Sequence, residues 1–366
     1  MARAIQLAQR GQLTASPNPA VGAVLVKAGQ VIGDGWHRCA GQPHAERVAL
    51  QQACDAGIDT AGATLYVSLE PCCFKGKTSA CTDAILTAGI SRVVSAMQDP
   101  NPSVAGKGHE LLATQGVSVA SGLLADNAAG LNRGFFKRMS QGLPFVTCKV
   151  ASSIDGRTAM ASGESQWVTS PSARALVQRL RARSCAIVTG VDTILADDPV
   201  YTVRERELGE PVARQPALVV LDSQLRTPPS AKIITQQLVE RDVFILTTQA
   251  ADSLRADALH AADVKVVELP CQGRRVDISA AVAWCAQQAF NELLLECGAT
   301  LAGAFMQAQR IDELHWFVAA KILGDSARPA FALPIETIDT AIDLDVTDIR
   351  AVGSDWRVVA RTSSAI

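Results

Sequence analysis

The residues of this chain whose types and spacing best suit chemistry are His44, Glu46, Cys72 and Cys81. One imidazole and two thiolates make an open zinc site, in which the fourth tetrahedral position is left for a water molecule. Zinc lowers the pKa of such a water, so that hydroxide is available near neutral pH. A neighbouring glutamate can carry protons from the attacking water to a departing amine. The spacing therefore predicts one catalytic zinc ion per chain, with Glu46 as the proton shuttle.

The order of these residues narrows the chemistry further. His-x-Glu followed by Pro-Cys and a second cysteine is the pattern of zinc deaminases that act on amino-pyrimidines and adenine. A structural zinc site and a chance association are the alternatives. Structural sites usually offer four ligands, and the remaining cysteines lack metal-like spacing, so most of them are expected to be small buried hydrophobes.

The helix and strand expected around the motif should orient its side chains toward the metal. Pro43 suits the first turn of a helix that continues through Leu50. Residues at i and i+2 do not share a helix face, so His44 and Glu46 should reach the metal end-on from the first turn. A strand at 64–69 runs into Pro71-Cys72, and a helix beginning after it would point backbone amides at the thiolates.

Composition bounds the class of protein. The chain has 366 residues, 48% of them hydrophobic and 19% charged, with a net charge of −2. This balance argues against a general nucleic-acid binder. No apolar run is long enough for a membrane span, and no signal-peptide pattern is present. Ten cysteines without framework spacing indicate reduced thiols and a cytoplasmic protein.

Length and punctuation predict two domains, 1–142 and 143–366, with the boundary at Gln141-Gly142-Leu143-Pro144. The first should be α/β with a mainly parallel sheet: helices at 2–9 and 82–88, strands at 21–26, 64–69, 91–95 and 117–119, and a hairpin partner at 31–35. The second should be α/β with a mixed sheet: strands at 145–150, 186–189, 217–221, 243–247, 264–268, 292–296, 315–319 and 356–360, and helices at 171–183 and 278–290.

The sequence of the second domain contains no motif that clearly indicates its chemistry. It has no G-x-G-x-x-G dinucleotide fingerprint. The segment from Glu296 to Gly303 runs from a strand into a helix, and its glycines would let a phosphate approach backbone N–H groups. A tight strand–helix turn without a ligand explains the same segment equally well.

Motifs in both halves resemble the bifunctional deaminase–reductases of riboflavin biosynthesis. The matching stretches are 17–22, 43–46, 69–72 with Cys81, 99–102 and 104–108 in the first half, and 149–157, 163–167, 195–199 and 296–303 in the second. Eight residues between the two cysteines also fit this family. The resemblance implies a cytidine-deaminase-like first domain and a second domain similar to dihydrofolate reductase.

The resemblance also implies the reactions. The first domain would hydrolytically deaminate 2,5-diamino-6-ribosylamino-4(3H)-pyrimidinone 5′-phosphate, and the second would use NADPH to reduce the ribosyl chain of the product to ribityl. It assigns His44, Cys72 and Cys81 to zinc and Glu46 to proton transfer. The positions that match NADPH contacts are Ala151, Trp167, Thr193, Asp197, Ser223, Gly298, Ala299, Thr300, Leu301, Ala302, Gly303 and Ala304. Those that match substrate contacts are Asn18, Ser165, Arg181, Tyr201, Arg204 and Glu296.

Arg181 and Arg204 suit the substrate phosphate, which an arginine can grip bidentately. Without the resemblance, Arg181 would be read as part of a solvated helix face and Trp167 as a core residue. Lys149 lies among apolar strand neighbours, where a lysine is costly unless paired or functional. It is therefore expected in the active site, near the reacting ribose.

The chain departs from the family pattern in the loop from Cys73 to Ala80. This loop lacks the usual histidine and so loses one substrate contact of the family, although Lys75 or Lys77 could still meet a phosphate there. Tyr201 stands where a smaller residue is common, and Asp192 replaces a neutral one.

A homodimer is expected. Two rival functions are a nucleic-acid base editor joined to an unrelated reductase and a non-catalytic zinc module. Only 4% of residues are aromatic, which disfavours the stacking surface of the first. Glu46 disfavours the second, since a structural metal needs no general base.

Overall fold

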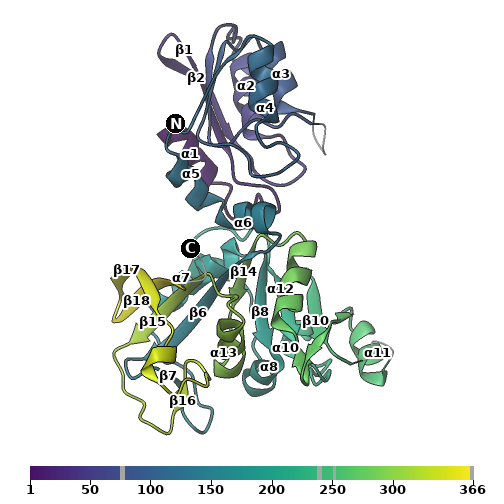
Figure 1. Cartoon of the computed structure of the whole chain (residues 1–366), viewed down its shortest axis with the longest axis vertical. Coiled ribbons are helices and arrows are strands. Elements are labelled where there is room, and N and C mark those ends of the chain that lie inside the picture. Colours follow the sequence, from purple (N-terminus) through teal and green to yellow (C-terminus); the bar gives the residue numbers. More distant parts are fainter. Residues whose placement is uncertain (75–78, 237–240, 250–252, 363–366) are drawn as a thin grey trace. The chain divides into compact units, whose positions relative to one another are not determined.

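The computed structural model describes residues 1–74, 79–236, 241–249 and 253–362, and the chain divides into two compact units, Met1–Leu143 and Pro144–Ile366 (Figure 1). The division falls one residue after the boundary expected from Gly142 and Pro144. Among the described residues, no helix combines the length and the apolar character needed to cross a bilayer.

The first unit is built on a five-stranded sheet in the order β2-β1-β3-β4-β5. The strands are β1 Gly22–Lys27, β2 Gln30–Trp36, β3 Thr64–Val67, β4 Arg92–Ser95 and β5 Ser118–Ser121. Only β3-β4 and β4-β5 pair in parallel, because β1 runs antiparallel to both of its neighbours. The expectation of a parallel sheet holds for β3, β4 and β5, and the expected β1–β2 hairpin is present, with positive φ at both Ala28 and Gly29 of its two-residue turn. The antiparallel pairing of β1 with β3 was not expected.

Helices cover both faces of this sheet. They are α1 Ala2–Gln9, α2 Ala45–Asp55, α3 Cys81–Thr87, α4 Lys107–Thr114, α5 Ala125–Leu131 and α6 Arg133–Gln141. The largest core cluster joins α2, α3 and α4 to one face, through residues such as Ala49, Ile85 and Leu112. Helix α2 approaches β2 so closely that a Cβ on Gly33 would lie 2.3 Å from the Ala49 carbonyl oxygen. This close contact packs α2 against β2, and the N-cap and first turn of α2 carry the predicted site residues His44 and Glu46.

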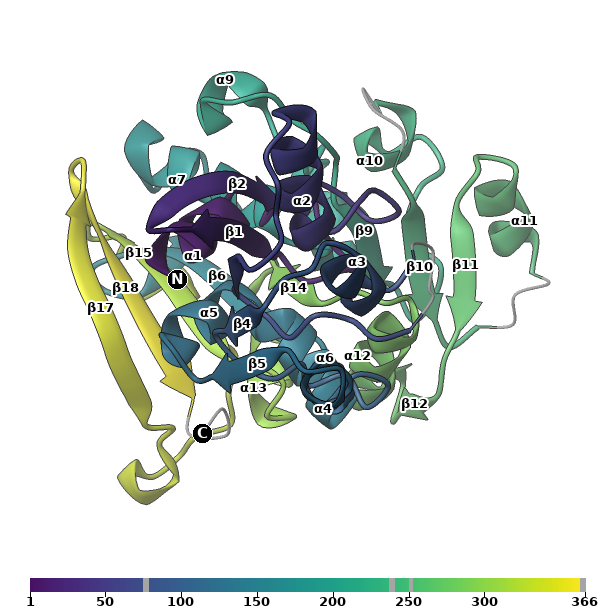
Figure 2. The ribbon, with the colours of Figure 1, turned by 90° about the horizontal axis from the view of Figure 1, so that it is seen from above.

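The second unit contains a nine-stranded mixed sheet in the order β11-β10-β9-β8-β14-β6-β15-β18-β17. Figure 2 shows its two ends, with β10 and β11 at one side and β17 and β18 at the other. The strands are β6 Phe145–Ser153, β8 Ala186–Gly190, β9 Ala217–Leu221, β10 Val243–Thr247, β11 Lys265–Glu268, β14 Glu292–Leu295, β15 Glu313–Ala319, β17 Leu344–Val352 and β18 Asp355–Thr362. All pairs from β11 to β15 are parallel, and the last two are antiparallel. The predicted mixed sheet is confirmed.

The helices of this unit begin with good caps where the sequence offers them. Ser170 and Asp277 accept hydrogen bonds from backbone N–H groups in the first turns of α7 (Pro171–Arg183) and α12 (Ile278–Gln287). The other helices are α8 Val191–Asp197, α9 Glu205–Leu208, α10 Lys232–Thr235, α11 Leu254–His260, α13 Ala299–Gln307 and the 3₁₀ turn Ile338–Thr340. Short strand pairs join β7 Arg157–Ala159 to β16 Arg328–Pro329, and β12 Cys271–Gln272 to β13 Arg275–Val276.

Strand β17 is absent from the sequence-based expectation. Its register with β18 shifts between Val346 and Asp348. A bulge of this kind interrupts the period-2 alternation by which a strand is recognised. Most of its residues are also exposed, so no buried run marks it.

Candidate active sites

The three predicted metal ligands converge in the first unit. His44 is the N-cap of α2, Cys81 is the first residue of α3, and Cys72 lies in the segment that follows β3. The Nδ1 atom of His44 lies 3.5 Å from the sulfur of Cys72 and 3.4 Å from that of Cys81. All three ligand atoms lie within 4.8 Å of one another. The helix begins at Ala45, so Pro43 precedes the cap and its expected place in the first turn is corrected.

Helix α3 supplies the backbone amides expected near the thiolates. The N–H of Cys81 donates to the sulfur of Cys72 at 3.4 Å and to its carbonyl oxygen at 3.1 Å. A hydrogen bond from the Cys81 side chain, helped by His44 and by this backbone N–H, lowers the pKa of the Cys72 thiol to about 4. Cys72 is therefore set up as a thiolate, the form that binds metals.

Glu46 lies beside this cluster in the first turn of α2. Its side chain is buried, and its Oε2 has no hydrogen-bond partner among the described residues. Burial raises the pKa of this carboxyl, and the charge of Cys72 raises it further. An unpartnered buried acceptor beside three N/S donors fits a zinc ion that carries a water.

A cavity of about 250 Å³ opens onto these residues, and its lining includes Asn18, His37, Asp99, Asn101 and Phe135. The Nδ2 of Asn18 lies 3.0 Å from Nε2 of His37, whose Nδ1 lies 3.2 Å from the Pro43 carbonyl oxygen. Because a carbonyl only accepts, Nδ1 of His37 is the donor and Nε2 accepts from Asn18. This assignment leaves Oδ1 of Asn18 as an acceptor beside the cavity.

A further carboxylate, that of Glu70, fixes a backbone segment that lines this cavity. Glu70, fully buried, accepts backbone hydrogen bonds from Asp99, Gly106, Gly108 and His109 at 2.9 to 3.2 Å. These donors lie 29 to 39 residues further along the chain. Glu70 therefore fixes the segment that contributes Asp99 and Asn101 to the cavity. The sequence contained this residue in a motif but gave no sign of its role.

The second unit has a larger cavity, of about 1320 Å³. Lys149, Ser165, Arg181, Tyr201, Arg204 and Glu296 line it, and so do eleven of the twelve positions expected to contact NADPH: Ala151, Trp167, Thr193, Asp197, Ser223, Gly298, Ala299, Thr300, Leu301, Ala302 and Ala304. Gly303 does not line it, because it faces the opposite way, where a Cβ would lie 2.1 Å from the Ala332 carbonyl oxygen. Its role is therefore close packing of α13.

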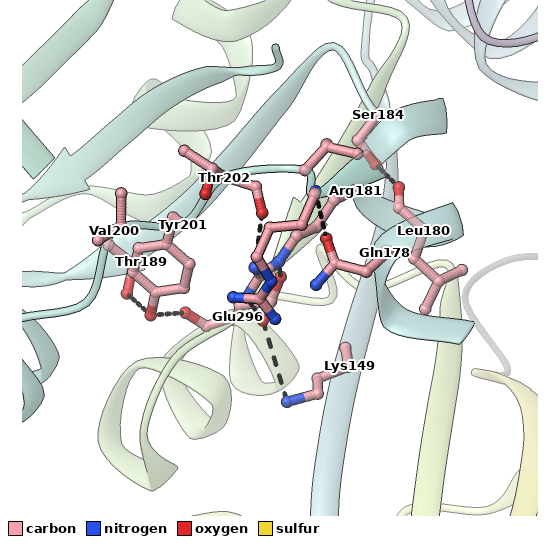
Figure 3. A network of polar contacts seen from close by, with 12 residues as sticks. Lys149, Gln178, Leu180, Arg181, Ser184, Thr189, Val200, Tyr201, Thr202 and Glu296 are labelled. Atoms are coloured by element: carbon pink, nitrogen blue, oxygen red, sulfur yellow. Dashed lines mark hydrogen bonds and ion pairs between the residues drawn. The ribbon is translucent and has the colours of Figure 1, made fainter. Parts of the chain in front are cut away.

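A buried ion pair lies at one end of this cavity (Figure 3). The guanidinium of Arg181 donates to both carboxylate oxygens of Glu296, at 2.6 and 3.0 Å, and to the Thr202 carbonyl oxygen at 3.0 Å. Burial alone would raise the pKa of the Glu296 carboxyl, but Arg181 outweighs it and holds this pKa below its usual value. The ammonium of Lys149 lies 3.9 Å from the same carboxylate. Arg181 therefore orients Glu296 and keeps it charged.

Hydrogen bonds hold both the side-chain hydroxyl and the backbone of Tyr201 in place. Its hydroxyl donates to the Glu296 carbonyl oxygen at 3.0 Å and accepts from Thr189, also at 3.0 Å (Figure 3). Arg241 donates to the carbonyl oxygens of Val200 and Tyr201 at 2.6 and 2.7 Å. Tyr201, which departs from the family pattern, thus stabilises the end of β14, which Glu296 directly follows. The other departure, Asp192, forms an ion pair with Arg226 at 2.6 Å.

The middle of the cavity fits a phosphate-bearing ligand. Helix α13 begins there, and no side chain caps its N-terminus. A Cβ built on Gly298, the N-cap, would meet only the Thr193 hydroxyl, at 4.0 Å. Backbone amides at such a helix start can receive a phosphate. Trp167 lies in the same cavity with 60% of its surface exposed, which is unusual for a core residue and suits a stacking contact. The expected loop contacts of Lys75 and Lys77 lie outside the described residues.

Comparison with known proteins identifies both units. The model of the cytidine and deoxycytidylate deaminase zinc-binding region matches residues 1–97, and that of the RibD C-terminal domain matches residues 144–358. The chain is 44% identical to the riboflavin biosynthesis protein RibD of Escherichia coli over 97% of this chain and 96% of that one. The chain belongs to the RibD family.

Solved structures agree with this assignment. RibD from Acinetobacter baumannii has a TM-score of 0.90 and 41% identity, and covers 99% of this chain and 97% of its own. A diaminohydroxyphosphoribosylaminopyrimidine deaminase/5-amino-6-(5-phosphoribosylamino)uracil reductase from Thermotoga maritima has a TM-score of 0.87 and 30% identity over 99% of this chain. The cytidine-deaminase-like first domain and the dihydrofolate-reductase-like second domain are thereby confirmed, as is the pairing of a zinc-binding deaminase with a reductase.

Proposed function

We propose that this RibD-family chain carries out two consecutive steps of riboflavin biosynthesis at the two cavities described. The first unit would deaminate 2,5-diamino-6-ribosylamino-4(3H)-pyrimidinone 5′-phosphate, and the second would reduce the ribosyl chain of the product with NADPH. The observation that carries the proposal is the unpartnered, buried Oε2 of Glu46 beside the His44, Cys72 and Cys81 cluster. A structural metal site would not need such a group.

In the first unit, His44, Cys72 and Cys81 would hold zinc, which lowers the pKa of a bound water. Glu46 would accept a proton from that water and deliver it to the leaving amine, a general acid–base role for which a raised pKa is suited. Asn18, with its amide oriented by His37, would accept a hydrogen bond from the pyrimidine.

In the second unit, NADPH would supply the hydride. The start of α13 would receive the cofactor phosphates, and Trp167 would pack against the cofactor. The contact between Lys149 and the charged Glu296 supports a role for the Lys149 ammonium as a donor to the reacting ribose. Arg204 lines the cavity and pairs with Glu207 at the surface, so it can turn to the substrate phosphate. Arg181 would act mainly through Glu296.

The decisive experiment measures ammonia release by the zinc-loaded full-length chain. The pyrimidine ribosyl phosphate should release ammonia, whereas transfer RNA and single-stranded DNA should release none. NADPH oxidation should then follow when the deaminated product accumulates. Ammonia from a nucleic acid and none from the free nucleotide would replace this function by base editing, and no ammonia from any of them would favour a non-catalytic zinc module.

A homodimer is also proposed. Strand β17 lies at the edge of the second sheet and exposes apolar side chains, with Val346 at 49% and Ile349 at 64%. An exposed edge strand with apolar side chains can be covered by a second copy of the chain. Light scattering of the intact protein, compared with the variant V346K/I349K, tests this surface; a dimer in both would place the interface elsewhere.

A further inference from the structure

A small hairpin in the second unit is fixed at one end of the large cavity. It consists of β12 (Cys271–Gln272) and β13 (Arg275–Val276), which follow β11 and precede α12. The buried Val276 donates its N–H to the hydroxyl of Ser223 at 3.0 Å. The next residue, Asp277, donates its N–H to the Pro270 carbonyl oxygen at 2.9 Å. The hairpin is therefore tied to the segment that follows β9.

The hairpin brings two cations to the cavity. Arg274 and Arg275 both line it, and both are exposed. Arg275 pairs with Gln272 through the backbone of the hairpin, but the side chain of neither arginine has a hydrogen-bond or ion-pair partner among the residues that the structure describes. The nearby Arg226 is engaged by Asp192, and at the far end Glu296 is neutralised by Arg181. The hairpin therefore leaves two arginines with unpaired side chains in the lining of a cavity whose ligand is expected to be anionic.

The order of the strands in the sheet indicates which part of a bound dinucleotide would reach Arg274 and Arg275. Lys149 lies on β6, and Ser223 follows β9, with β14 and β8 between these strands. Three strand spacings correspond to about 14 Å. The start of α13, where the phosphates are proposed to bind, follows β14 and so lies between the two ends. A nicotinamide beside Lys149 would thus leave the adenosine of an extended cofactor beside Ser223 and the hairpin.

We propose that Arg274 and Arg275 bind the 2′-phosphate on the adenosine ribose, and that this hairpin selects NADPH over NADH. An arginine near this ribose is how a dinucleotide site accommodates the 2′-phosphate, and the planar guanidinium matches a phosphate bidentately. The inference rests on the proposed reductase function and adds to it the residues that determine cofactor choice.

The test uses ligands that differ only in the phosphate at issue. Calorimetric titration of the full-length chain with adenosine 2′,5′-bisphosphate and with 5′-AMP gives a ratio of dissociation constants for the 2′-phosphate. In R274A/R275A this ratio should fall at least about tenfold, as expected for the loss of charge-assisted contacts, while 5′-AMP binding is retained. R274K/R275K should keep part of the preference. R179A, which removes an exposed charge from α7 outside the cavity, should leave the ratio unchanged.

Kinetics provide the second readout. The ratio of kcat/KM for NADPH to that for NADH should fall in R274A/R275A by a similar factor, and NADH turnover should persist. An unchanged ligand ratio in R274A/R275A, or an equal loss of both adenosine ligands, would overturn the assignment of the hairpin. If the unmodified chain oxidised neither dinucleotide with the deaminated pyrimidine, the proposed reductase function itself would fail.

Discussion

Gly108 donates its backbone N–H to Glu70 at 2.9 Å, and a Cβ on this glycine would lie 2.1 Å from the carbonyl oxygen of Pro71. The start of α4 therefore packs against the backbone immediately before Cys72, a proposed zinc ligand. Only glycine allows this approach, so the wall of the deaminase cavity and the ligand segment are positioned together.

Replacement of Gly108 should disturb this contact. We expect Gly108→Ala to destabilise the protein by about 1–3 kcal/mol, the usual cost of overpacking, and to weaken zinc binding because the Pro71–Cys72 segment must move. Gly130→Ala is the matched control: it lies in α5, where a Cβ meets nothing within 4 Å, and helical Ala is favoured over Gly by about 0.5–1 kcal/mol. Thermal denaturation and zinc titration measure both effects. Normal zinc affinity in a folded Gly108→Ala protein would show that the two segments are not coupled.

The metal ligands can be distinguished from their neighbour. Purified protein should contain about one zinc ion per chain, as a three-ligand catalytic site implies. Cys81→Ser should lose the zinc and the deaminase activity together. Cys73→Ser, next to Cys72 but outside the cluster, should keep both. Elemental analysis and ammonia release give the readouts, and zinc retained in Cys81→Ser would remove Cys81 from the site.

Glu46 should matter for proton transfer and not for metal binding. Glu46→Gln preserves the shape of the buried side chain but cannot exchange protons, so ammonia release should fall by about 10²- to 10⁴-fold, the range for general acid–base catalysis. Zinc content should stay the same. NADPH oxidation should also be unaffected when deaminated substrate is supplied, because the proposed reductase residues all belong to the second unit. A folded variant that lost both reactions would argue for one shared site.

The sequence was most informative where a local pattern determines the structure. The zinc ligands could be predicted because their chemistry depends on residue type, and the buried strands because short apolar runs mark them. The antiparallel pairing of β1 was not anticipated in full, since strand direction follows from topology and not from composition. The bulge in β17 hid that strand.

Contacts between distant residues were the least predictable. Nothing in the local sequence links Glu70 with the amides of 99–109, or Arg181 with Glu296, which is 115 residues away. Arg181 resembles a surface residue in its own helix, and the pairing that buries it is created only by the fold. The hairpin arginines were missed because two adjacent arginines in a loop have no distinctive spacing.

The two arginines expected to bind the substrate phosphate should differ in their effects. Arg181→Met would leave the buried Glu296 carboxylate without its hydrogen-bonded partner and with only the Lys149 ammonium 3.9 Å away, at a cost of up to about 3–5 kcal/mol. The double variant R181M/E296Q should recover part of that stability, because the uncompensated charge is gone. Arg204→Ala breaks only an exposed pair with Glu207, so its stability should change by less than about 1 kcal/mol while KM for the pyrimidine rises. Scanning calorimetry and steady-state kinetics separate the two, and equal stability of R181M and the unmodified chain would refute a structural role for Arg181.

The two glycines that flank the first turn of α13 provide the sharpest test of the cofactor cradle. A side chain on Gly298 has room beside Thr193 and would project into the cavity, so Gly298→Val should fold normally but obstruct the approach of phosphate to the backbone amides. Its NADPH affinity should fall, with pyrimidine KM nearly unchanged. A side chain on Gly303 would instead collide with the Ala332 carbonyl oxygen, so Gly303→Val should lower the melting temperature first and affect ligands only through the loss of folded protein. NADPH fluorescence titration and thermal melting on the two variants resolve these outcomes. NADPH binding that survived Gly298→Val intact would mean that the cofactor phosphates bind away from this helix.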